Sequence, residues 1–217
     1  MITFAVTDPA AGKRGISAFI VPAPAPGLSV SSIEHKLGQQ ASDTAQLTYA
    51  DVAVDAGLMI GAEGEGYRIA LANLETGRIG IAAQSVGMAQ AAVEYAVAYA
   101  RERQSFGRPI VEHQAVLFRL ATMATQLEAA RGLVLTAAAL KDAGRPCLKE
   151  ACMAKLFASE VAEEITSAAI QVLGGYGYVR DYPVEKIYRD VRVCQIYEGT
   201  SDVQKMIIGR ELLASSG

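Results

Sequence analysis

The chain has 217 residues, 51% of them hydrophobic, and a formal net charge of -3. This size and apolar content suit one or two globular domains with a real core and exclude a disordered protein. Lys and Arg are scattered and slightly outnumbered by Asp and Glu, so the basic stripe of a nucleic-acid binder is missing. No apolar run approaches the roughly 20 residues of a membrane span, and the opening segment lacks the features of a signal peptide. We therefore expect a soluble, cytoplasmic protein without nucleic-acid or membrane partners.

Residues 1 to about 57 alternate apolar and polar positions in short runs, a period typical of strands that bury one face. The runs are ITFAV, SAFIV, LSVSSI and AQLTYADVAV, separated by the turn-rich segments DPAAGKRG and PAPAPG. About four or five strands are predicted. An open sheet of this size needs something to cover its faces and edges.

From about Gly64 the apolar period becomes helical. Three long helices are predicted, broken at SFGRP and DAGRP, where Gly and Pro stop helical hydrogen bonding. QVLGGYGY ends the third, a shorter segment surrounds residues 183–191, and a last helix covers about 200–213. Four main helices with short links predict an antiparallel four-helix bundle. The recurring apolar positions are Ala89, Val93, Ala96 and Ala100; Val116, Leu120, Met123 and Leu127; and Ala154, Phe157, Val161, Ile165, Ala168 and Val172.

The segment MIGAEGEG, residues 59–66, has the glycines and acids of a connector that leads into a helix N-terminus. We place the domain boundary there, with a strand domain over residues 1–60 and a helical domain over residues 61–217. The predicted fold class is therefore α+β, mostly α.

Cysteine and histidine show neither a disulfide framework nor a zinc pattern. Cys147, Cys152 and Cys194 form no C-x-x-C pair, and His35 and His113 lie far apart in the sequence. We predict buried, reduced thiols and no metal site. A Cys-His nucleophile stays open as an alternative, although nothing nearby in the sequence supports it.

Glu198 interrupts an apolar run in CQIYEGTSDVQ, residues 194–204, and Gly199 follows it at once. Ser201, with Gln204 three residues later, fits a capping signature, which places Glu198 just before a helix N-terminus. Backbone N–H groups at such an end favour an anion. A partly desolvated carboxylate there is a candidate general base, and the alternative is a purely electrostatic cap.

A second signal comes from arginines and glycines. Arg101, Arg103 and Arg108 crowd a predicted helix end in RERQSFGRPI, where planar guanidinium groups either bind phosphate oxygens or only offset the helix dipole. The glycines of QVLGGYGY either terminate a helix or also leave the backbone open to a ligand. No Lys-Ser or Lys-Thr follows them, so this is not a P-loop.

Three stretches, taken in chain order, carry a resemblance that spans the whole chain. They are GISAFIVPAPAPGLSVSSIEHKLGQQASDTAQLTYADVAV, LANLETGRIGIAAQSVGMAQAAVEYAVAYARERQSFGRPI and QVLGGYGYVRDYPVEKIYRDVRVCQIYEGTSDVQ. Together they resemble the acyl-CoA dehydrogenases, FAD enzymes that oxidise acyl-CoA thioesters to 2-enoyl-CoA. The resemblance implies the end of a middle antiparallel β-barrel followed by the C-terminal helical bundle. It also implies a homotetramer and electron-transfer flavoprotein as electron acceptor.

For the site, the resemblance implies that Glu198 is the catalytic base. It would remove the pro-R α proton of the thioester while the β hydride passes to the flavin. The backbone amide of Glu198 would polarise the thioester carbonyl as an oxyanion-hole donor does, and Gly199 would contact the substrate. Glu75 and Arg78 match an acidic-x-x-Arg pair near the CoA chain.

The resemblance also implies two groups of FAD contacts. One group reaches the FAD of a neighbouring subunit, and the other contacts FAD within the same subunit. The first group is Arg103, Gln114, Gln171, Gly174 and Gly175, and the second is Thr200, Ser201 and Asp202.

The chain departs from the family pattern in several places. Gln40 stands where Arg is common before ASDT, and Glu75 replaces the commoner Asp. Some relatives carry the base on the first bundle helix, where this chain has Gly77, which cannot take a proton. Family members also have an N-terminal helical domain and earlier barrel strands, so Met1 is expected to mark a truncation or a misassigned start.

Three functions are therefore weighed. The first is the C-terminal part of an FAD-dependent acyl-CoA dehydrogenase for a short or medium acyl chain, branched chains included. The second is a helical assembly module that keeps the oligomerising bundle without flavin or turnover. The third is an oxygen-using flavin oxidase on the same fold. Visible absorbance separates the first two, and oxygen consumption with acyl-CoA identifies the third.

Overall fold

The computed structural model describes residues 1–214 and divides the chain into two compact units, residues 1–74 and 75–217. The fold is α+β and mostly helical, as predicted. The division falls inside the long helix α1 (Gly66–Glu102), which begins where the sequence predicts a connector leading into a helix.

The first unit holds five strands in two antiparallel sheets, and its described residues form no closed barrel. One sheet has the order β1-β2-β5, with Ile2 opposite Ile20 and Ala18 opposite Ile60. The other pairs β3 with β4 and contains an irregularity between Val30 and Ser32. The strands are β1 (Ile2–Val6), β2 (Ile16–Ile20), β3 (Leu28–Ile33), β4 (Ala45–Tyr49) and β5 (Met59–Ile60).

Two details of the predicted strands were wrong. The strand predicted over AQLTYADVAV stops at Tyr49, because the chain turns at Asp51, whose φ is +52°. The short strand β5 lies in the segment that the sequence assigns to the connector. Two residues are too few to show alternation, so this strand leaves no periodic signal.

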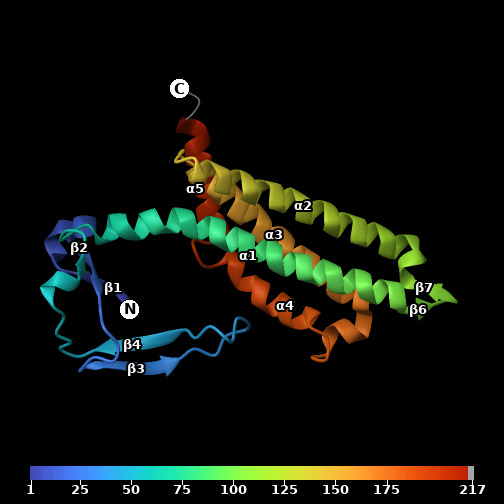
Figure 1. The fold of residues 1–217 in the computed structure, drawn as a ribbon, viewed down its shortest axis with the longest axis horizontal. Helices are drawn as coiled ribbons and strands as arrows, with labels where there is room; N and C mark the ends of the chain where they lie inside the picture. Colours follow the sequence, from blue (N-terminus) through green and yellow to red (C-terminus); the bar gives the residue numbers. More distant parts are fainter. Residues whose placement is uncertain (215–217) are drawn as a thin grey trace. The chain divides into compact units, whose positions relative to one another are not determined.

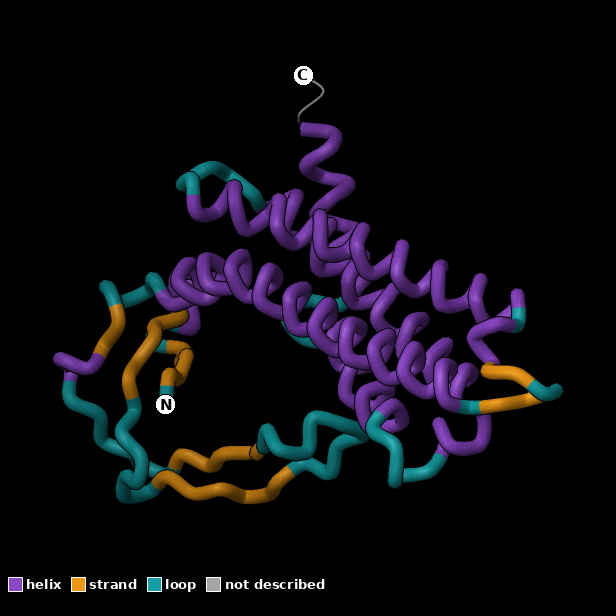
Figure 2. The backbone as a smooth tube through the Cα atoms, turned by 45° about the vertical axis from the view of Figure 1, so that its right-hand side comes forward, coloured by secondary structure: helices purple, strands orange, loops and turns teal. Residues whose placement is uncertain are grey.

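The second unit consists mainly of helices (Figures 1 and 2). α3 packs against α2, α4 and α5, and the short hairpin β6–β7 joins α1 to α2. The predicted breaks, the shorter segment and the last helix are confirmed. The elements are β6 (Gln104–Ser105), β7 (Arg108–Pro109), α2 (Gln114–Asp142), α3 (Leu148–Leu173), α4 (Val184–Val191) and α5 (Ser201–Ala214).

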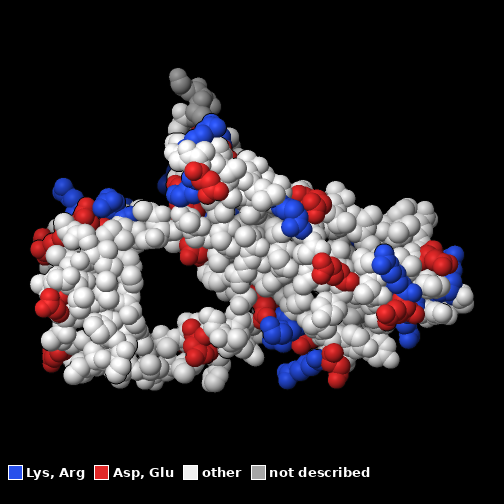
Figure 3. Space-filling model, viewed as in Figure 1, with Lys and Arg blue, Asp and Glu red and all other residues white. Residues whose placement is uncertain are grey.

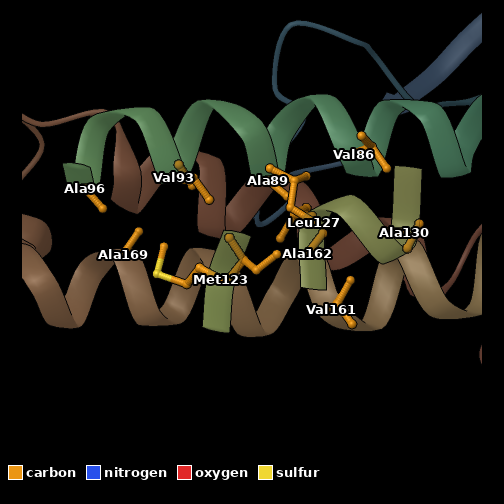
Figure 4. Packing of buried hydrophobic residues seen from close by; sticks show 14 of the residues in the cluster. Val86, Ala89, Val93, Ala96, Met123, Leu127, Ala130, Val161, Ala162 and Ala169 are labelled. Carbon is orange, nitrogen blue, oxygen red and sulfur yellow. The ribbon is translucent and has the colours of Figure 1, made fainter. Parts of the chain in front are cut away.

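The core of this unit lies between α1, α2 and α3, and it follows the predicted helical period. Figure 4 shows Val86, Ala89 and Val93 of α1 facing Met123 of α2 and Ala162 of α3. Of the recurring apolar positions predicted from the sequence, Val116, Phe157 and Ala168 are partly buried and the others are buried. Small residues dominate the contact, which lets the helices approach closely.

The remaining predictions about composition concern cysteines, charge and membranes. All three cysteines are free and buried, as predicted. On the face drawn in Figure 3, acidic and basic side chains of the second unit are intermixed. Among residues 1–214, no helix combines the length and apolarity needed to cross a membrane.

Candidate active site

Glu198 lies in a tight left-handed turn between the 3-10 helix η5 (Arg192–Gln195) and α5. Its φ is +55°, and the φ of Gly199 is +89°. Glycine adopts this conformation freely, whereas a residue with a side chain loses about 1–2 kcal/mol in it. A strained glutamate persists only where its surroundings hold it, and such residues cluster at functional sites.

The carboxylate of Glu198 rests on Gly77 of α1. A Cβ atom added at Gly77 would lie 2.5 Å from Oε2 of Glu198 and 2.8 Å from its Cδ, so any side chain there displaces the carboxylate. Oε2 is buried and has no hydrogen-bond partner within residues 1–214. A buried oxygen without a partner is rare in folded proteins, and a catalytic or ligand-binding role is one explanation for it.

The carbonyl groups of the turn are held from two helices. Nε2 of Gln204 on α5 donates to the carbonyl oxygens of Glu198 at 3.0 Å and Gly199 at 2.9 Å. Nζ of Lys155 on α3 donates to the Gly199 carbonyl at 2.7 Å. Both side chains are fully buried. They fix the turn through its backbone carbonyls.

The predicted cap of α5 was wrong by one residue. α5 begins at Ser201, and Oγ1 of Thr200 accepts a hydrogen bond from the Val203 amide at 3.4 Å. Gln204 faces the turn carbonyls instead of closing a capping box with Ser201, whose buried Oγ has no partner in the described part of the chain. The placement of Glu198 just before a helix N-terminus is confirmed.

Tyr197 anchors the turn on its N-terminal side. Its hydroxyl donates to Oε1 of Gln84 on α1 at 2.6 Å and lies 3.5 Å from Sγ of Cys194. Burial raises the pKa of Tyr197 well above its ordinary value, and the hydrogen bond with Cys194 acts in the same direction. The phenol is therefore neutral at physiological pH and serves as a fixed hydrogen-bond donor.

Glu75 and Arg78 lie on α1 close to Gly77, and they differ in their hydrogen-bond partners. Glu75 forms an ion pair of 2.9 Å with Lys141 on α2, and this hydrogen bond is the main cause that lowers the pKa of Glu75. Arg78 is 6% exposed, and its Nε has no hydrogen-bond partner in residues 1–214. A buried guanidinium N–H without an acceptor is costly and suits a site that receives an anionic or carbonyl group.

A second group of predicted residues meets at the other end of α1. Arg103, Gly174 and Gly175 line one pocket of about 640 Å³ together with Tyr99 and Tyr176. The guanidinium carbon of Arg103 lies 5.9 Å from the centre of the Tyr176 ring, within the range of a cation–π contact. The cation is exposed and available to an anion.

The two glycines of this pocket have different local roles. Gly174 ends α3 with a φ of +60°, a value that favours glycine, whereas Gly175 does not need a positive φ. A Cβ atom at either residue would meet nothing within 4 Å. The backbone beside Arg103 is therefore open to close approach.

Four further predicted contacts do not line this pocket. Gln114 is the first residue of α2, and Gln171 lies in the last turn of α3; both are exposed. Thr200 and Asp202 are exposed at the start of α5.

The two groups of predicted residues lie far apart in one chain. Gly77 lies in the N-terminal third of α1 and Arg103 directly follows its last residue, so at 1.5 Å per residue their separation along the helix axis is roughly 40 Å. Figure 1 shows the hairpin β6–β7 at one end of the helical unit and α5 towards the other. One chain thus presents two separate half-sites.

Sequence reasoning did not single out Lys155 or Gln84. Lys155 does carry a signal, because it interrupts the apolar sequence ACMAKLFA in a helix whose neighbouring positions are buried. A charged residue on a buried helix face needs a partner. The partner could not be identified from local sequence, since it is a backbone carbonyl in another segment.

Comparison with known proteins identifies the family of the chain. The family described as "Acyl-CoA dehydrogenase, C-terminal domain" matches residues 64–213. The chain belongs to the acyl-CoA dehydrogenase family.

Individual relatives match almost the whole chain. An acyl-CoA dehydrogenase of Bacillus subtilis is 52% identical over 99% of this chain and 57% of that protein. The structure of butyryl-CoA dehydrogenase from Megasphaera elsdenii has a TM-score of 0.95 and 46% identity, covering 98% of this chain and 55% of its own. A structure described under the electron transferring flavoprotein of Acidaminococcus fermentans has a TM-score of 0.96 and 48% identity, covering 98% and 56%. The chain therefore spans about half the length of the relatives it matches.

Proposed function

We propose that this chain forms the C-terminal half of an FAD-dependent acyl-CoA dehydrogenase, with Glu198 as the base that takes the α proton of an acyl-CoA thioester. The observation that carries the proposal is the Glu198 carboxylate, which has a buried oxygen without a partner in residues 1–214 and lies against Gly77. An electrostatic cap would accept hydrogen bonds from α5, and in the described part of the chain Oε2 of this carboxylate accepts none. This geometry favours the base over the cap.

The substrate is an acyl-CoA thioester with a short acyl chain, and the product is the 2-enoyl-CoA. The likeness to butyryl-CoA dehydrogenase supports the short chain. Gly199 contacts the substrate, and the Glu198 amide polarises the thioester carbonyl, which strengthens the acidity of the α proton. Arg78, whose buried Nε has no partner within residues 1–214, supports the CoA chain, while Glu75 is engaged by Lys141.

The residues present fit FAD, which when bound supplies the acceptor for the β hydride. The exposed Arg103 beside an aromatic ring and two open glycines suits a pyrophosphate, because a guanidinium binds phosphate oxygens bidentately. Ser201, whose buried hydroxyl has no partner in residues 1–214, lies at the N-terminus of α5 with Thr200 and Asp202. These three residues contact the FAD of the same subunit.

The distance between the half-sites supports an assembly. The two half-sites lie about 40 Å apart along α1. The residues of the first predicted group contact the FAD of a neighbouring subunit; they are Arg103, Gln114, Gln171, Gly174 and Gly175. We infer a homotetramer in which α1, α2, α3 and α5 act as an antiparallel four-helix bundle at its centre. Its setting is the cytoplasm, and electron-transfer flavoprotein is the electron acceptor, as the likeness to the Acidaminococcus fermentans structure suggests.

The test uses a completed enzyme, in which the N-terminal half of the Bacillus subtilis relative precedes this chain. Butyryl-CoA added without oxygen should bleach the visible flavin absorbance. A preparation that carries no flavin would favour the assembly module, and rapid oxygen consumption with butyryl-CoA would favour an oxidase. Bound flavin that no acyl-CoA reduces would overturn the proposal.

The Arg103→Ala substitution should weaken FAD retention by the completed enzyme without unfolding it. Hydrogen bonds to charged groups contribute about 1.5–3 kcal/mol, so FAD affinity should fall roughly 10- to 100-fold. Because Arg103 is exposed, its removal should leave the melting temperature of the apoprotein unchanged. Ultrafiltration followed by flavin absorbance measures the loss.

Arg101→Ala is the matched control, because Arg101 lies on the same helix end, is exposed and does not line the pocket. It should retain FAD like the unaltered enzyme. Arg103→Lys should retain FAD better than Arg103→Ala but less well than the unaltered enzyme, since an ammonium lacks the planar fork. An Arg103→Ala enzyme with unchanged FAD affinity would contradict the role of this residue.

The chain expressed by itself should associate but not retain one FAD per subunit. Leu117, Phe118 and Leu135 on α2 are at least half exposed, and apolar surface of this kind drives association. Its half-sites offer contacts to the pyrophosphate of FAD. These contacts must offset, nearly alone, the free-energy cost of ordering the bound FAD. Light scattering after size-exclusion chromatography and the ratio of flavin to protein absorbance test both parts. A monomer, or one tightly bound FAD per chain, would contradict the corresponding part.

A further inference from the structure

Lys155 is a buried cation in the middle of α3. Its side chain is the largest among those that the structure buries fully, with 0% exposure. Removing an ammonium from water is unfavourable unless its hydrogens find acceptors. The acceptor that the structure provides is the carbonyl oxygen of Gly199, 2.7 Å from Nζ.

That carbonyl belongs to the strained turn that carries Glu198. Both Glu198 and Gly199 have positive φ, and each carbonyl accepts a hydrogen bond from a buried side chain. Gln204 approaches from α5 and Lys155 from α3, so the turn is clamped between two helices. A charged donor binds a carbonyl more strongly than a neutral amide does.

Titratable groups on several elements act electrostatically on Lys155. They are Arg78 of α1, Cys152 of α3 itself, Cys194 of η5 and Glu198 of the turn. Burial lowers the pKa of Lys155 most, and Arg78 acts in the same direction, while the two thiols and Glu198 raise it. Glu198 is thus the carboxylate that favours the charged form of this lysine.

We propose that Lys155 is a positioning residue of the active site, which holds the Gly199 carbonyl so that the turn keeps the Glu198 carboxylate against Gly77. The proposal rests on the role of Glu198 as the base. Lys155 binds the backbone of the turn, and it acts on the reaction through Glu198. Its loss should move the carboxylate while leaving the rest of the helical unit in place.

The first test is the crystal structure of the chain with Lys155→Met, a change that keeps an unbranched side chain of similar length and removes the donor and the charge. We expect Glu198 to leave the left-handed region and its carboxylate to move away from Gly77. Lys149→Met is the control, because Lys149 lies on the same helix and pairs with Glu150 near the surface. A turn and carboxylate that stay in place after Lys155→Met would overturn the proposal.

The second test measures flavin reduction by butyryl-CoA in the completed enzyme. Lys155→Met should lower the limiting rate roughly 10- to 100-fold, since small misplacements of a catalytic group have effects of this size. The KM for butyryl-CoA and the bound FAD should change less than about twofold, because a group that acts only on the reacting geometry affects kcat. A normal rate per folded, FAD-loaded enzyme, with only a lower melting temperature, would show that Lys155 merely fills space.

Lys155→Gln keeps the proposal testable if the methionine variant does not fold. Its shorter, neutral side chain should also release the Gly199 carbonyl and lower the limiting rate, and an unchanged rate would count against Lys155. The crystallographic test needs no activity. An inactive completed enzyme with Lys155 in place would therefore refute the proposed function without deciding whether Lys155 holds the turn.

Discussion

Glu198→Gln in the completed enzyme should keep the bound FAD and lose its reduction by acyl-CoA. Glutamine has nearly the same shape as glutamate, so it can occupy the same space over Gly77 and keep the left-handed turn. It cannot take a proton at neutral pH. A general base typically contributes about 10²- to 10⁴-fold, and Gly77 offers no replacement at the other family position.

Stopped-flow measurement of flavin bleaching with butyryl-CoA tests this result. Glu128→Gln is a suitable control, because Glu128 is an exposed carboxylate on α2 that pairs with Arg131 on the same helix. The control should react at the normal rate. A Glu198→Gln enzyme that reduces its flavin at a near-normal rate would require another base.

The helical half of the fold was predictable because its signals are local. Recurring apolar residues such as Ala89 and Val93 identify the buried face of α1, and Gly and Pro mark the breaks on either side of α2. The hairpin β6–β7 within SFGRP was missed. Its turn residues Phe106 and Gly107 have positive φ, and the sequence of the break indicates only that the helix stops.

The geometry of the site was less predictable, since its contacts join segments distant in sequence. The capping pattern correctly placed Glu198 before α5, but nothing local shows that its carboxylate lies on Gly77 of α1. The same applies to Gln204, whose side chain holds the turn carbonyls instead of completing a capping box. The family resemblance implies the proposed role of Glu198, and the structure adds the packing of its carboxylate against Gly77.

Gly77→Ala should slow flavin reduction because it fills the space that the Glu198 carboxylate occupies. The added Cβ would lie 2.5 Å from Oε2, a contact that real atoms do not tolerate, so the carboxylate must move. A misplacement of about 1 Å at a reacting group can lower the rate about 10²-fold. Bound FAD should be unaffected, because Gly77 is not among its predicted contacts.

Gly80→Ala is the matched control on the same helix. A Cβ atom at Gly80 would meet nothing within 4 Å. Replacing glycine by alanine inside a helix adds about 0.8–1 kcal/mol of stability through propensity alone, so Gly80→Ala should raise the melting temperature and keep the normal rate.

At Gly77 the added Cβ meets the far end of a flexible side chain, so the Glu198 carboxylate moves aside at small cost and the protein still folds. Thermal unfolding of the two variants, followed by circular dichroism, should therefore show a cooperative transition in both. Their limiting rates of flavin reduction should differ, with the lower rate for Gly77→Ala. If Gly77→Ala reacts as fast as Gly80→Ala, the position of the Glu198 carboxylate over Gly77 is not the one from which it takes the proton.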